Sequence, residues 1–144
     1  MAVEITKVDI WAGQIADRAG GLAEKLEAVA EAGANLEFVI ARRTPERPGA
    51  GVVFMAPLKG AGQTRAAQKA GLSRTPNLHT LRLEASNRPG LGAKMARAVA
   101  DAGINARGVS AVGLGRRCVV YAAFDTETDA RKATQVLKKA LSAK

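Results

Sequence analysis

The chain carries one stretch of sequence twice. Residues 17–35 read DRAGGLAEKLEAVAEAGAN, and residues 87–105 read NRPGLGAKMARAVADAGIN. Nine of the nineteen aligned positions are identical, including two glycines and the final asparagine. The offset between the copies is longer than the roughly 20–50 residues of solenoid repeats. The sequence therefore predicts two copies of one small domain.

Each copy predicts a turn followed by an amphipathic helix. In the first copy, Leu22, Leu26 and Val29 recur at helical spacing with charged residues between them. Gly33 and Gly103 then end the two helices as C-terminal caps. Together with the apolar segments around them, each half reads strand, helix, strand, strand, helix, strand. This order is typical of a ferredoxin-like α+β fold, with domains at 1–74 and 75–144.

Each half has too few residues of its own for the fourth strand of this fold. Residues 3–15 read as one strand, and residues 77–85 must serve both halves or share those roles. Only three residues follow Leu141, so the last strand of the second half must come from residues 3–11 or be absent. The two halves are therefore expected to complete one another.

The overall composition favours an ordinary globular protein with a positive surface. The net charge is +9, but the basic residues are scattered, so nucleic acid is an unlikely partner and a solvated surface is the simpler interpretation. The single cysteine excludes an internal disulfide. No apolar run approaches 18 residues and no signal pattern is present, so a cytoplasmic protein without a membrane partner is expected.

The two repeated stretches resemble ACT domains, which are βαββαβ modules that mostly bind amino acids and regulate metabolic enzymes. The motif Asn87-Arg88-Pro89-Gly90 with Gly103-Ile104-Asn105 matches the family pattern closely, and Asp17-Arg18-Ala19-Gly20 with Gly33-Ala34-Asn35 has alanine in the proline position. The resemblance implies a tandem ACT protein without catalytic activity or cofactor. It also implies an amino acid ligand and a regulated enzyme as partner.

The turns suit an anionic ligand because the first turn of a helix has free N–H groups and partial positive charge. Glycine there lets a ligand approach closely, and Asp17 or Asn87 could meet an amino group. The candidate ligand-binding residues are Asp17, Ala19, Gly20, Gly21, Asn35, Asn87, Pro89, Gly90, Leu91 and Asn105. An equally plain interpretation makes Asp17 and Asn87 helix caps, and Asn35 and Asn105 left-handed residues that end the helices.

Two departures from the family pattern concern packing. Gly92 and Ala96 stand where the family helix has leucine, and close-packed interiors require a neighbour to fill that space. This observation and the missing strand favour a homodimer. His79 and Cys118 have no partners at catalytic or metal-ligand spacing. The alternatives to a ligand-binding regulator are a basic RNA-binding module of the same topology and an interaction subunit without ligand.

Overall fold

The computed structural model describes residues 3–142, and the chain divides into two compact units. The first unit runs from Asp9 to Thr75. The second unit joins the N-terminal segment up to Val8 with the chain from Pro76 onward. The expected ranges 1–74 and 75–144 therefore need a correction at the N-terminal segment, because its strand pairs within the second unit.

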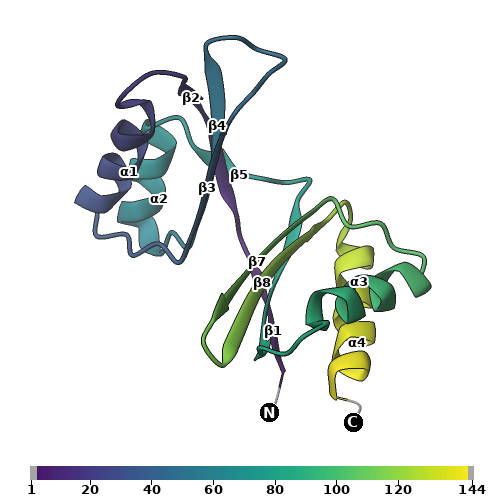
Figure 1. Cartoon of the computed structure of the whole chain (residues 1–144). Helices are drawn as coiled ribbons and strands as arrows, with labels where there is room; N and C mark the ends of the chain where they lie inside the picture. The colour runs from purple at the N-terminus through teal and green to yellow at the C-terminus, as the bar shows by residue number, and fades with distance from the viewer. Residues whose placement is uncertain (1–2, 143–144) are drawn as a thin grey trace. The chain divides into compact units, whose positions relative to one another are not determined.

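The first unit is a four-stranded antiparallel sheet covered by two helices. Its strands have the order β3-β4-β2-β5. Helices α1 and α2 lie side by side (Figure 1). The core contains Trp11, Val29, Val53, Met55 and Leu72. In chain order the elements are β2 (Trp11–Ala16), α1 (Gly21–Glu31), β3 (Phe38–Arg43), β4 (Ala50–Ala56), α2 (Gly60–Lys69) and β5 (Ser73–Arg74).

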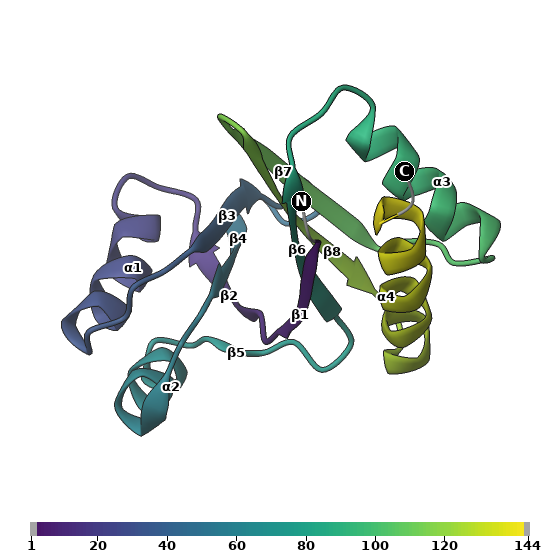
Figure 2. The ribbon, with the colours of Figure 1, turned by 90° about the horizontal axis from the view of Figure 1, so that it is seen from below.

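The second unit repeats this arrangement with one strand taken from the start of the chain. Its strands have the order β1-β6-β8-β7, and α3 and α4 cover one face of the sheet (Figure 2). The hydrophobic core of this unit includes Leu83, Phe124 and Leu137. Its elements are β1 (Glu4–Val8), β6 (His79–Ser86), α3 (Leu91–Asp101), β7 (Gly108–Leu114), β8 (Arg117–Phe124) and α4 (Glu127–Ser142). The first unit thus has ferredoxin-like βαββαβ topology, as the sequence predicts, and the second has the same sheet arrangement with its last strand supplied from the start of the chain.

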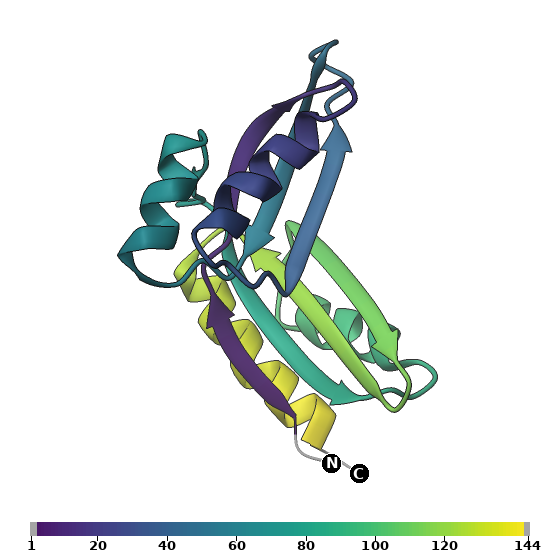
Figure 3. The ribbon, with the colours of Figure 1, turned by 90° about the vertical axis from the view of Figure 1, so that its left-hand side faces the viewer.

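The missing strand of the second unit is β1. It lies antiparallel beside β6 (Figure 3), and the register places Glu4 opposite Glu84 and Val8 opposite Thr80. The expectation that residues 3–11 complete the second half is confirmed. The expectation of one strand over residues 3–15 is wrong, because β1 and β2 belong to different sheets. Residues 77–85 do not serve both halves either, since the first unit closes with the two-residue β5.

The helices α1 and α3 end in the same way. Gly33 and Gly103 have φ of +87° and +77°, and each lies one residue beyond the C-cap. The N–H of Gly33 donates to Ala30 O, and that of Ala34 donates to Val29 O; Gly103 and Ile104 repeat both bonds. This Schellman arrangement requires a left-handed residue, which glycine adopts without a steric cost.

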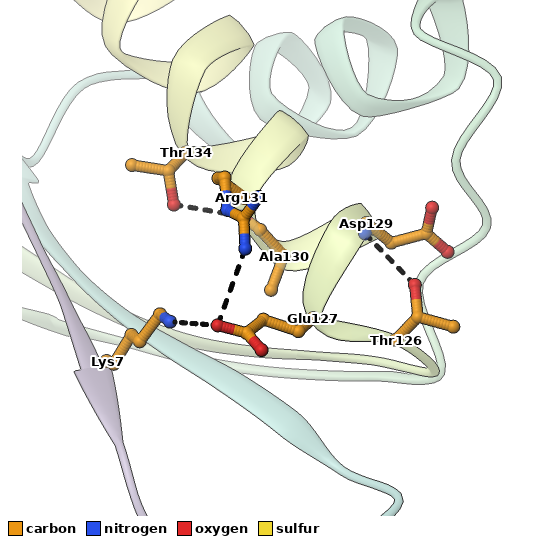
Figure 4. Close-up of polar contacts among 7 residues, drawn as sticks. All are labelled: Lys7, Thr126, Glu127, Asp129, Ala130, Arg131 and Thr134. Atoms are coloured by element: carbon orange, nitrogen blue, oxygen red, sulfur yellow. Dashed lines mark hydrogen bonds and ion pairs between the residues drawn. The ribbon is translucent and has the colours of Figure 1, made fainter.

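An ion-pair cluster links β1 to α4 in the second unit. Lys7 Nζ lies 3.0 Å from Glu127 Oε1, and Arg131 Nη2 lies 3.6 Å from the same oxygen (Figure 4). The Thr126 hydroxyl accepts a hydrogen bond from the Asp129 N–H at 3.0 Å, so Thr126 caps the N-terminus of α4. The hydrogen bond from Lys7 and its charge hold the pKa of Glu127 below its ordinary value.

This cluster predicts a small pH dependence. Because its pKa is lowered in the folded protein, ionised Glu127 stabilises the second unit at pH values above about 4.3, the ordinary pKa of a glutamate. This contribution is lost as the pH falls through the lower pKa that Glu127 has in the folded protein. Replacing Lys7 by Met should raise the pKa of Glu127 in an NMR titration. Arg18→Met is the matched control, because it removes the partner of Glu24 instead. An unchanged pKa of Glu127 in Lys7→Met would contradict this assignment.

Candidate functional site

The two repeated stretches form the same turn in both units. The backbone N–H of Asp17 donates to Gly49 O at 3.0 Å, and that of Asn87 donates to Arg116 O at 2.8 Å. Each turn is thereby tied to the loop between the two strands that follow its helix. The fold places Asp17, Ala19, Gly20 and Gly21 together at the start of α1, and Asn87, Pro89, Gly90 and Leu91 together at the start of α3.

Glycine provides the N-cap of both helices in a left-handed conformation. Gly20 has φ of +89° and Gly90 has φ of +83°, and neither helix has a side-chain cap. The plain interpretation of Asp17 and Asn87 as capping residues is therefore wrong. The carbonyls of Gly20 and Gly90 accept the N–H groups of Glu24 and Lys94. In the first turns of α1 and α3, the N–H groups of four residues have no hydrogen-bond partner among the described residues. They are Leu22, Ala23, Gly92 and Ala93.

The charged side chains at the start of α1 already form ion pairs with other residues of the first unit. Arg43 Nε lies 3.0 Å from Asp17 Oδ2, and Arg18 Nη2 lies 2.6 Å from Glu24 Oε1. The hydrogen bond from Arg18 lowers the pKa of Glu24. A carboxylate of the chain itself therefore occupies the positive end of α1. This leaves little electrostatic attraction for a second anion.

The second turn has the opposite charge balance. Lys94 replaces Glu24, Asn87 replaces Asp17, and no acidic side chain of the described chain pairs with Arg88 or Lys94. Asn87 Nδ2 donates to Gly115 O at 3.1 Å, and its Oδ1 accepts no hydrogen bond from the described residues. Arg88 and Lys94 are exposed. Sequence reasoning did not single out Lys94, although the exchange of Glu24 for Lys94 was readable in the aligned copies.

Gly21 has a packing role. It is buried, and a Cβ at this position would overlap the carbonyl oxygen of Ala16 on β2. Because Gly21 has no side chain, α1 can pack closely against the sheet. We therefore assign Gly21 this packing role and not a contact with the ligand. The aligned residue Leu91 instead packs against the core of the second unit.

The two asparagines at the helix ends lie away from the turns. Asn35 and Asn105 follow the C-termini of α1 and α3, one helix length of about 16 Å from the turn glycines. Neither has positive φ, so the interpretation of both as left-handed residues is wrong; Gly33 and Gly103 hold that conformation. Asn105 lines a groove beside α3.

The histidine and the cysteine of the chain lie on two strands of the second unit. His79 lies on β6 and Cys118 is a buried free thiol on β8. The described chain has no group of three or more histidine, cysteine and acidic residues that could hold a metal ion. Its helices are also too short or too polar to span a membrane.

Comparison with known proteins identifies the fold. No protein-family model and no curated protein matches the chain. Among solved structures, protein BT0572 from Bacteroides thetaiotaomicron superposes with a TM-score of 0.77 at 16% identity, covering 94% of this chain and 89% of that one. The ligand-free regulatory subunit of aspartate kinase from Thermus thermophilus gives a TM-score of 0.68 at 19% identity, with 97% of both chains covered.

A third similar structure is part of a larger enzyme. E. coli aspartokinase III, in complex with aspartate and ADP, gives a TM-score of 0.63 at 13% identity and covers 99% of this chain but 33% of its own. At these identities the likeness shows the fold. It confirms the predicted tandem ferredoxin-like fold of the ACT type.

Proposed function

We propose that this protein is a non-catalytic regulatory protein that binds a small amino acid at the turn from Asn87 to Leu91. The observation that carries the proposal is the uncapped, cationic start of α3. There the free N–H groups of Gly92 and Ala93 lie next to Arg88 and Lys94, which have no acidic partner in the described chain. A carboxylate is stabilised at such a helix start by hydrogen bonds and by the helix dipole.

The same turn offers a group for the ligand's ammonium. Asn87 Oδ1 accepts no hydrogen bond from the described residues, while Nδ2 is held by Gly115 O. An α-amino acid presents its carboxylate and ammonium on one carbon, so both groups can reach this turn together. We expect the turn from Asp17 to Gly21 to bind an amino acid more weakly, because Glu24 already pairs with Arg18 and Arg43 already pairs with Asp17.

Structures with this fold support a regulatory role. Two of the similar structures are regulatory subunits of aspartate kinase, from Thermus thermophilus and Thermus flavus. By analogy, we propose that the chain acts on a partner enzyme, works as a homodimer in the cytoplasm, and has no catalytic activity of its own. A thermal-shift screen of the full chain against the twenty amino acids tests the proposal. A shift with none of them would favour an interaction subunit without ligand.

The charge of Lys94 provides a sharper test. Lys94→Glu restores the residue found in α1 and should weaken binding of the amino acid about fivefold at low ionic strength, equivalent to about 1 kcal/mol. The same change should slightly raise the melting temperature of the free protein, because an acidic residue in the first helical turn is favourable.

Titration calorimetry on three proteins measures this effect. Lys132→Glu on α4 makes the same change of net charge at an exposed position outside the turn. It should bind the amino acid like the unaltered chain. Equal affinities for Lys94→Glu and Lys132→Glu would place the carboxylate elsewhere.

A further inference from the structure

The second unit contains an apolar groove between α3 and the strands β7 and β8. Its volume is about 280 Å³. Buried core residues form its floor, including Met95, Val99 and Phe124. Asn105 is the one polar side chain among the residues that line it. Its size lies just below the range of about 300–1,000 Å³ typical of small-molecule sites.

The groove exists because two leucine side chains are missing from α3. Gly92 and Ala96 line it, and they align with Leu22 and Leu26 of α1. In the first unit these leucines pack against the core. The sequence predicts that a neighbour fills this space, but within the second unit it is open. An ideal Cβ at Gly92 would have no atom within 4 Å. Empty apolar volume of this kind favours occupation by an apolar group.

One end of the groove reaches the proposed carboxylate site. Gly92 is the second residue of α3 and carries one of the free N–H groups, and it also lines the groove. From there the groove follows α3 to Ala100, about 12 Å along the helix axis at roughly 1.5 Å per residue. Arg88 and Lys94 belong to the turn and the first helical turn at this end but do not line the groove, whose lining is apolar except for Asn105. The free N–H at the start of α3 and the adjoining apolar space therefore match a ligand with an anionic head and an aliphatic side chain.

We infer that the groove holds the side chain of the ligand, and that the site selects amino acids with a branched aliphatic side chain. This inference rests on the proposed function. The carboxylate binds at the start of α3, the ammonium meets Asn87, and the side chain enters the groove over Met95, within one helical turn of Gly92. Glycine or aspartate leaves the groove empty or brings a second charge into it, which is unfavourable in apolar surroundings.

Titration calorimetry of the full chain with L-leucine, L-alanine and L-aspartate tests the inference. Leucine should bind roughly 50-fold more tightly than alanine, since it buries three more carbon groups and each contributes about fourfold. Aspartate should bind more weakly than leucine. Alanine or aspartate binding as tightly as leucine would overturn the inference.

Filling the groove should remove this preference. Ala96→Leu and Gly92→Leu restore the two side chains present in α1, so they should lower leucine affinity at least 10-fold without lowering the melting temperature. Ala30→Leu is the matched control, because Ala30 is exposed on α1 in the first unit. Leucine binding that is equally tight in all three variants would overturn the groove as its site and leave the proposed function standing. Absence of binding by all three probes to the unaltered chain would overturn both.

A measurement on the unaltered chain keeps the test independent of how the variants fold. Addition of L-leucine should shift the NMR methyl signals of Val109 and Val120, which line the groove. The signals of Val39 and Val53, on the matching strands of the first unit, should stay in place. Leucine-dependent shifts confined to the first unit would contradict the inference.

Discussion

Replacing Gly21 by alanine is expected to destabilise the first unit by about 3 kcal/mol. The added Cβ would overlap Ala16 O and lie 3.1 Å from its carbonyl carbon, and backbone atoms of a paired strand cannot move aside as a flexible side chain can. Overpacking of this kind costs about 1–3 kcal/mol and occasionally more. Urea denaturation followed by circular dichroism measures the loss.

A second glycine gives the opposite expectation. Gly62 lies inside α2, and no atom lies within 4 Å of a Cβ at that position. Gly62→Ala should therefore stabilise the same unit by about 0.5–1 kcal/mol, because alanine has the higher helix propensity. A Gly21→Ala protein as stable as the unaltered chain would show that α1 does not pack against β2 as described.

An amino acid at about 100 times its dissociation constant is expected to add roughly 2.7 kcal/mol to the stability of the folded protein. For a chain of this size that is a rise of about 5–10 °C in melting temperature, at roughly 2–4 °C per kcal/mol. Gly90→Val should abolish the rise, because a branched side chain would stand at the start of α3 where the carboxylate binds. Differential scanning fluorimetry measures both effects.

Strain must be separated from the loss of the site. Gly90 has φ of +83°, so a valine there is strained as well as obstructive. Gly60 has φ of +81° at the start of α2, with no neighbouring atoms that a Cβ would meet. Gly60→Val therefore introduces the same strain away from the site and should keep the ligand-induced rise. A full rise in folded Gly90→Val would place the ligand elsewhere.

Local signals predicted most of the fold. The repeated stretch contains both the apolar spacing of the helices and the glycines that end them, and Gly33 and Gly103 adopt the left-handed conformation that this pattern requires. The shortage of sequence after Leu141 also indicated where the fourth strand of the second unit originates. The break between β1 and β2 was not predicted, because both segments are apolar and only their non-local partners, β6 and β4, distinguish them.

The site was predicted less completely because its properties depend on tertiary neighbours. The turn glycines were identifiable from sequence. The pairing of Asp17 with Arg43 depends on β3, which is far away in the chain. The burial of Gly21 depends on the position of Ala16. The groove beside α3 was visible only as two missing leucines, and whether a neighbour fills that space is a question of packing.

The most direct test of the central claim is an amide NMR titration of the full chain with the amino acid that gives the largest thermal shift. The account predicts that the N–H signals of Gly92 and Ala93 move most, because they donate hydrogen bonds to the carboxylate at the start of α3. The N–H signals of Leu22 and Ala23, at the start of α1, should move less. Signals of Gly92 and Ala93 that stay in place while others move, or a spectrum that none of the twenty amino acids changes, would contradict it.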